Sequence, residues 1–165
     1  MIMMRKHSLL GEATDAGFLG ASAVALWFLV HDSLRGRPLL TPSVLGQLFL
    51  LGNPHPVTSS IDFGAMIMYT VVHFIAFLLF GLLLASVFRH CVEQAVARFA
   101  VLVLFAVFEF CFYVVINVVS TEVGALFPLW TVAGANLLAA IVMGAYFWLR
   151  YPELKQVLHD EPLGA

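Results

Sequence analysis

Charged side chains are scarce in this sequence of 165 residues. Asp, Glu, Lys and Arg together make up 11% of it, whereas 62% of the residues are hydrophobic. Soluble domains carry about 25% charged residues, and a soluble fold of this size could not bury so much apolar surface. The composition therefore predicts a protein that is surrounded by lipid. The net charge of −2 provides no basic surface, so we expect no nucleic-acid partner.

The sequence also lacks the residue patterns of common enzymes and redox sites. Its two cysteines, Cys91 and Cys111, are too far apart for a C-x-x-C pair, and Cys111 lies inside an apolar run. No G-x-S-x-G, H-E-x-x-H, Walker or G-x-G-x-x-G motif is present. We therefore expect a protein that is not an enzyme, with no catalytic residues and with neither a disulfide nor a zinc site.

Four apolar stretches are long enough to cross a bilayer, which requires about 20 residues of helix. They cover residues 11–30, 63–88, 99–120 and 129–149. We predict one all-α domain over residues 1–165, folded as an up-and-down four-helix transmembrane bundle. Glu12 and Asp15 interrupt the apolar part of the first stretch, which argues against a cleaved signal peptide and for a retained first helix.

The distribution of Lys and Arg predicts the orientation in the membrane. With four spans, six of these residues fall on one side and two on the other. The six are Arg5, Lys6, Arg89, Arg98, Arg150 and Lys155, and the two are Arg35 and Arg37. Because loops rich in Lys and Arg stay in the cytoplasm, we predict a multi-pass protein whose N and C termini are both cytoplasmic.

The only long connection, residues 31–62, then lies on the outer side. Thr41-Pro42 is typical of a helix start, with a capping residue followed by proline in the first turn. Gly52-Asn53-Pro54 is typical of a helix end. The predicted helix, over about 42–51, is too short to span, so we expect it to lie along the outer membrane interface.

Polar side chains inside the apolar stretches are the main candidates for function. Glu109, Tyr113 and Asn117 are four residues apart, which places them on one face of the third predicted helix. His73 lies near the middle of the second stretch and Asn136 in the fourth. Because sequential antiparallel helices are usually neighbours, we predict that His73 and Glu109 lie within hydrogen-bonding distance or one water apart.

Three interpretations of these polar residues stay open. They form a structural network that fixes helix packing, with Glu109 protonated. Alternatively, they form a proton, quinone or small-molecule site, since ionisable groups inside a membrane are functional candidates. In the third interpretation, His73 supplies an axial ligand to haem. The sequence itself predicts no resident cofactor, and haem or quinone enters only through the last two interpretations.

Four residues on the outer side are of metal-ligand types. They are His31, Asp32, His55 and Asp62. Their spacing fits no known metal site, so we expect solvated loop side chains there and no bound metal. We expect Arg35 and Arg37 to anchor the outer interface near lipid phosphates, with binding of a substrate as the alternative.

Two groups of residues carry a resemblance to known proteins. The first group is Ala25-Leu26-Trp27-Phe28-Leu29-Val30, Asp32, Gly36-Arg37-Pro38-Leu39, Thr41-Pro42 and Leu45-Gly46, and the second is Gly134-Ala135-Asn136-Leu137-Leu138 and Met143-Gly144-Ala145-Tyr146. In these residues the chain resembles a group of short bacterial four-span membrane proteins of unknown function, and the similarity extends over its whole length. The resemblance implies a location in the bacterial cytoplasmic (inner) membrane and supplies no catalytic residue.

Two non-enzymatic functions follow as hypotheses. Small residues at four-residue spacing, such as Gly17, Ala21 and Ala25, allow close contact between helices, either inside the bundle or with another protein. The leading hypothesis is an accessory or assembly subunit of a larger bacterial membrane complex, such as an electron-transfer complex. Its partners would be membrane lipids and other membrane subunits or a second copy. The alternative is a small carrier or binding protein with a proton, quinone or small-molecule site at His73 and Glu109.

Overall fold

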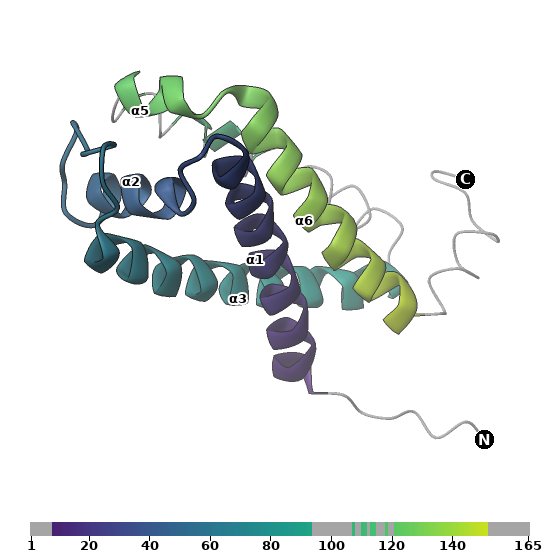
Figure 1. Cartoon of the computed structure of the whole chain (residues 1–165). Coiled ribbons are helices and arrows are strands. Elements are labelled where there is room, and N and C mark those ends of the chain that lie inside the picture. The colour runs from purple at the N-terminus through teal and green to yellow at the C-terminus, as the bar shows by residue number, and fades with distance from the viewer. Residues whose placement is uncertain are drawn as a thin grey trace.

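The computed structural model describes residues 8–93 and 121–151, together with the single positions 107, 110, 111, 113, 114 and 118. The elements in these ranges are all helices (Figure 1). They are α1 (Leu9–Leu34), α2 (Leu40–Phe49), α3 (Phe63–Glu93), α5 (Thr121–Leu126) and α6 (Leu129–Arg150). The prediction of an all-α chain is confirmed for this described part, which contains no strand.

The ends of the long helices follow from local capping. At the start of α1, the Ser8 hydroxyl accepts the Gly11 N–H at 3.1 Å, and at the start of α3 the Asp62 carboxylate accepts the Ala65 N–H at 2.9 Å. α1 continues past the predicted end at residue 30 and stops before Gly36, whose φ of 71° lies in the left-handed region that favours glycine. The extension contains His31 and Asp32, which pack against other elements.

α1 is the central helix and runs antiparallel to both α3 and α6. Near its start, the Glu12 carboxylate contacts Arg89 of α3 and Arg150 of α6. Near its other end, the Trp27 indole N–H donates to the carbonyl of Thr131, in the first turn of α6, at 3.0 Å. α3 and α6 are therefore parallel to each other, and both end beside the start of α1 (Figure 1).

Glycines bring the backbones of α1 and α3 together. A Cβ added at Gly17 would lie 2.5 Å from the carbonyl oxygen of Phe77, and one added at Gly81 would lie 2.4 Å from the carbonyl oxygen of Ala13. No real side chain fits at such distances, so the crossing requires glycine on both helices. Gly17 is thus used inside the bundle, one of the two roles expected from the spacing of small residues. Ala21 is buried as well, whereas Ala25 is exposed.

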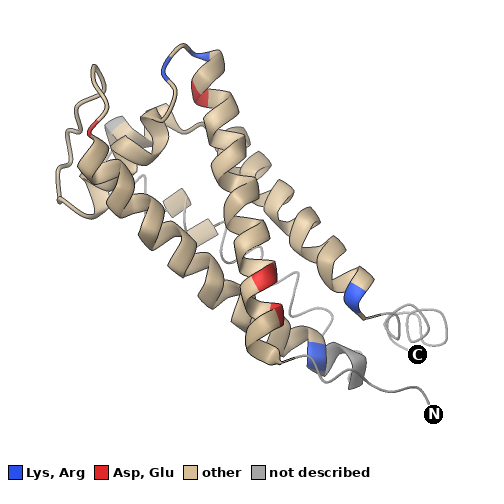
Figure 2. Ribbon diagram, turned by 60° about the horizontal axis from the view of Figure 1, so that its bottom comes forward, with Lys and Arg blue, Asp and Glu red and all other residues tan. Residues whose placement is uncertain are grey.

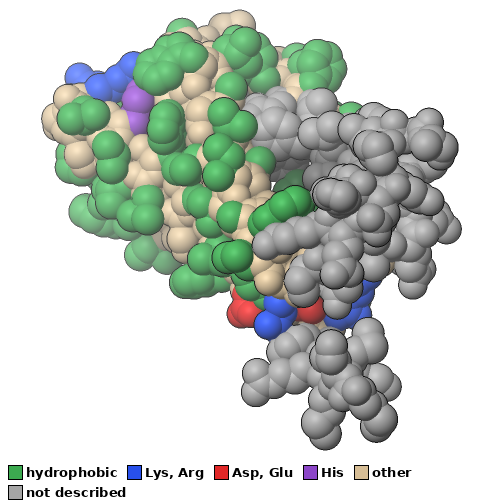
Figure 3. Space-filling model, turned by 90° about the vertical axis from the view of Figure 1, so that its right-hand side faces the viewer, with side chains coloured by type: hydrophobic (Ala, Val, Ile, Leu, Met, Phe, Trp, Pro, Cys, Tyr) green, Lys and Arg blue, Asp and Glu red, His purple; other side chains and the backbone are tan. Residues whose placement is uncertain are grey.

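Three helices are long and apolar enough to cross a membrane: Leu9–Leu34, Phe63–Arg89 and Leu129–Arg150. Charged residues lie toward the two ends of the molecule, with an uncharged stretch of helix between them (Figure 2). Large apolar side chains such as Phe18, Ile67, Leu79 and Ile141 are exposed, and hydrophobic side chains spread over one face of the molecule (Figure 3). Water would disfavour such a surface, so these helices indicate a membrane protein.

The short helix α2 packs against the beginning of α3. Most of its residues are buried, and a Cβ added at Gly46 would lie 2.1 Å from the carbonyl oxygen of Ala65. Its bounds overlap the range 42–51 expected from the sequence. The predicted third span, 99–120, lies outside the described residues except for the six single positions. The four-span arrangement therefore stays a prediction.

Candidate functional site

His73 lies in the middle of α3 and contacts α1. Its Nε2 is 3.2 Å from the carbonyl oxygen of Ala21. A carbonyl only accepts hydrogen bonds, so Nε2 must carry the proton, and in the neutral ring Nδ1 is left as an acceptor. The ring stacks on Tyr69 at a centroid distance of 5.9 Å and lies 4.8 Å from the ring of Phe77. His73 thus offers one acceptor atom in an aromatic environment.

Asn136 of α6 supplies a donor that has no partner in the part of the chain that the structure describes. The residue is only 8% exposed, and its Nδ2 has no hydrogen-bond partner among the described residues. Leaving a buried amide unpaired costs about 1–3 kcal/mol, and native structures rarely accept this cost without a water or a ligand nearby. The side chain therefore marks a place where a further polar group would be stabilised.

A cavity of about 220 Å³ lies between α1, α2, α3 and α6 and brings these side chains together. Its polar lining residues are His73, Asn136 and Tyr69, and the others are aliphatic residues and phenylalanines such as Val24 and Phe80. A second cavity of about 210 Å³ is also lined by His73 and Tyr69 and extends toward the start of α2. His73 therefore lies beside two mostly apolar spaces.

Three of the five site residues predicted from the sequence belong to the described part of the chain. His73 and Asn136, both proposed as site residues, line the same cavity. Tyr113 is half-buried. Glu109 and Asn117 lie outside the described residues, so the predicted contact between His73 and Glu109 stays a prediction. The partner that the described residues provide for His73 is the backbone of α1, which sequence periodicity could not indicate.

The outer residues of metal-ligand type are used in other ways. Asp32 accepts the Thr41 N–H at 2.7 Å and the Thr41 hydroxyl at 2.9 Å, and Asp62 caps α3. The prediction of a solvated side chain was wrong for Asp32, which is 4% exposed because it holds the turn between α1 and α2. The His55 N–H donates to the Asn53 side chain. The described residues contain no group of three metal-ligand side chains.

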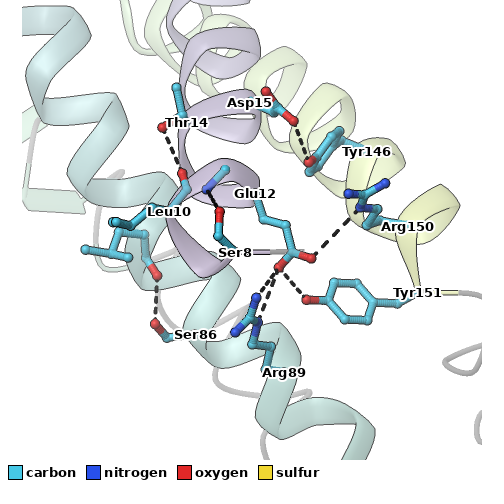
Figure 4. Close-up of polar contacts among 12 residues, drawn as sticks. Ser8, Leu10, Glu12, Thr14, Asp15, Ser86, Arg89, Tyr146, Arg150 and Tyr151 are labelled. Carbon is cyan, nitrogen blue, oxygen red and sulfur yellow. Dashed lines mark hydrogen bonds and ion pairs between the residues drawn. The ribbon is translucent and has the colours of Figure 1, made fainter. Parts of the chain in front are cut away.

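A polar cluster that the sequence did not indicate joins the three long helices at one end (Figure 4). Glu12, 5% exposed, accepts the Arg89 guanidinium at 3.0 Å and the Tyr151 hydroxyl at 2.7 Å, both at Oε2, and Arg150 lies 3.9 Å from Oε1. One turn along, Asp15 accepts the Tyr146 hydroxyl at 3.0 Å. The spacing of Glu12 and Asp15 could have indicated this cluster, since residues three apart share a helix face.

Contacts within the cluster also shift the pKa of one of its tyrosines. Burial, followed by the hydrogen bond to Glu12, raises the pKa of Tyr151 above its ordinary value. Arg89 forms an ion pair with Glu12 across the helix interface. Most polar groups of the cluster pair with one another, and only Nε of Arg150 has no hydrogen-bond partner among the described residues. We therefore interpret the cluster as structural.

Comparisons with known proteins leave the function to be argued from this geometry. The chain matches no protein-family model, no curated protein and no solved structure.

Proposed function

We propose that this chain is a non-enzymatic integral membrane protein of a bacterial cytoplasmic membrane that binds a mostly apolar small molecule between its helices. The observation that carries the proposal is Asn136, whose Nδ2 has no partner among the described residues and which lines the same cavity as His73. A ligand carbonyl would accept from Asn136, and a ligand hydroxyl would donate to Nδ1 of His73. A quinone and its reduced form carry both groups on an apolar ring.

The size of the cavity decides which part of the ligand it would hold. Complete ligand sites usually measure about 300–1,000 Å³, and this cavity measures about 220 Å³. It is therefore suited to a ring-sized head group, with an apolar tail extending toward lipid or the neighbouring cavity at Tyr69. Its largely apolar walls favour a neutral ring over a charged molecule.

The direction of the helices supports four spans. α3 ends at Arg89 beside Glu12, whereas α6 begins at Leu129 at the opposite end of α1, where Trp27 contacts Thr131. If α3 and α6 both cross the bilayer, the chain between them must cross it once more. The apolar residues 99–120 have the length for that crossing. On this topology the Glu12 end is cytoplasmic, because most Lys and Arg residues lie there, and α2 lies on the outer side.

Ligand binding is tested with the full chain in lipid nanodiscs, titrated with a short-chain quinone. We expect saturable binding, and a loss of affinity of about tenfold or more for Asn136→Leu and for His73→Leu, equivalent to about 1.4 kcal/mol. Ser86→Ala is the matched control, because its hydroxyl bonds to the carbonyl of Leu82 on the same helix as His73, and it does not line either cavity. Absence of saturable binding, or unchanged affinity in Asn136→Leu, would overturn the proposal.

A second candidate function is the accessory or assembly subunit, and Gly144 favours it. Unlike Gly17 and Gly81, Gly144 has no described atom within 4 Å of the place where its Cβ would lie. The resulting notch on α6 would admit the backbone of a helix from a partner subunit or a second copy. Gly144→Leu should then break the assembly in native lipid, while Ala145→Leu, at the exposed neighbouring position, should not. A wild-type chain that is monomeric in native lipid and binds or transports its ligand alone would contradict this role.

A further inference from the structure

A polar pocket, distinct from the two cavities beside His73, lies at the end of the molecule opposite the Glu12 cluster. It measures about 230 Å³ and is formed by the end of α1, the following turn, the start of α2 and residues Leu126 and Phe127. Its polar lining residues are His31, Asp32, Arg35, Arg37 and Thr41. We propose that this outer pocket binds one oxyanion, a phosphate or carboxylate group, between Arg35 and Arg37 and against His31. The proposal is independent of ligand binding at His73.

The two arginines are presented by one turn, and no described carboxylate neutralises them. The carbonyl of Asp32 accepts the N–H groups of Arg35 and Arg37 at 3.1 and 2.9 Å, and Gly36 between them adopts the left-handed conformation. Both arginines are exposed, and neither guanidinium pairs with a carboxylate among the described residues. Guanidinium groups bind phosphate and carboxylate through paired N–H donors, so this turn offers two such groups to one ligand.

The described residues do not supply His31 with the hydrogen bonds that a buried imidazole needs. Its ring lies edge-on to the rings of Phe28 and Trp130, at centroid distances of 6.3 and 5.8 Å. Both ring nitrogens are buried and have no hydrogen-bond partner among the described residues. At least one of them is a donor in every protonation state. No described group accepts a hydrogen bond from this donor. An oxyanion in the pocket would accept it.

The charges around the pocket favour an anion over a cation. Asp32 is the one carboxylate among the described side chains that line the pocket, and both of its oxygens already accept hydrogen bonds from Thr41. Its Oδ1 lies 3.7 Å from Nδ1 of His31, beyond hydrogen-bonding distance. The described lining residues comprise two arginines and one aspartate, which gives them a net charge of +1 when His31 is neutral. A metal ion would therefore be repelled, whereas a phosphate or carboxylate would be attracted.

The same chemistry occurs in a lipid head group and in a free anion, and two measurements separate these sources. In the first, the full chain in nanodiscs of phosphatidylcholine is titrated with inorganic phosphate by calorimetry. In the second, the chain is exposed to phosphatidylglycerol in mixed nanodiscs, and bound lipid is counted by native mass spectrometry. Saturable binding in the first measurement supports a soluble oxyanion, and a retained lipid in the second supports a head group.

Three variants test the named residues. We expect Arg35→Gln and Arg37→Gln each to weaken binding by about tenfold or more, whereas Arg150→Gln, which removes one positive charge at the Glu12 end of the molecule, should leave it unchanged. His31→Phe keeps a ring between Phe28 and Trp130 and removes both unpaired nitrogens, so it should weaken binding without lowering thermal stability. If neither phosphate nor phosphatidylglycerol binds saturably, or if both arginine variants bind as the wild type does, the proposal is wrong.

Discussion

The Glu12 carboxylate of α1 and the Arg89 guanidinium of α3 form an ion pair across the helix interface, with Oε2 and Nη2 3.0 Å apart. The same Oε2 accepts the Tyr151 hydroxyl at 2.7 Å, directly after the end of α6 (Figure 4). One carboxylate oxygen therefore holds three helices together at the proposed cytoplasmic end. Glu12 is 5% exposed, so its charge depends on these partners for stabilisation.

Removing Arg89 should destabilise the chain more than removing both members of the pair. Arg89→Met leaves a buried carboxylate with weaker partners, and we expect a loss of about 1–3 kcal/mol in the free energy of unfolding, because the arginine itself is partly exposed. The double variant Glu12→Gln with Arg89→Met removes the buried charge, leaves only the partly exposed Arg150 without its carboxylate, and should recover part of the loss. A double-mutant cycle in detergent micelles measures this coupling, and additive effects would contradict it.

Tyr151 should make stability depend on pH in the alkaline range. Its pKa is raised in the folded chain, chiefly by burial and then by the hydrogen bond to Glu12, so folding favours the protonated phenol. The resulting stabilisation is fully present below the ordinary pKa of about 10 and is lost as pH rises through the raised value. Unfolding midpoints of the wild type and of Tyr151→Phe should therefore converge above about pH 10. A constant difference across that range would rule out the phenol as the titrating group.

Hydropathy predicted where the long helices are, but not which side chains meet between them. Phe63 begins α3 as predicted, because the change from a polar loop to an apolar run is local. The contacts of Glu12 with Arg89 and of Asp32 with Thr41 depend on how neighbouring helices rotate and on the course of a turn. Periodicity fixes the face of a helix on which a residue lies, and it leaves open which helix that face meets. His73 illustrates this limit, since its described partner is the backbone of α1.

Asp32 should be essential for the turn that carries Arg35 and Arg37. In Asp32→Ala the buried N–H and hydroxyl of Thr41 both lose their acceptor, and we expect a loss of about 1–3 kcal/mol in the free energy of unfolding. Thr41→Val removes only the hydroxyl and keeps the backbone bond, so its loss should be smaller. Thermal unfolding of both variants in the same detergent compares them. Equal losses would mean that the backbone bond to Asp32 contributes nothing.

The crossing of α1 and α3 should tolerate no side chain at Gly81. A methyl group there would lie 2.4 Å from the carbonyl oxygen of Ala13 and 2.8 Å from the amide nitrogen of Gly17, and both atoms belong to backbone that cannot rotate away. Gly→Ala at an unobstructed helical position stabilises by up to about 1 kcal/mol, whereas overpacking costs about 1–3 kcal/mol. Gly81→Ala should therefore lower the unfolding midpoint.

Gly144→Ala provides the matched control, because no described atom lies within 4 Å of the added methyl group. We expect it to preserve or raise the midpoint of the isolated chain, measured by thermal unfolding in detergent beside Gly81→Ala. Since both substitutions are the same change inside a long helix, helix propensity cancels in the comparison and only the contact with the neighbouring backbone differs. Equal midpoints for the two variants would show that α1 and α3 do not approach this closely in the membrane.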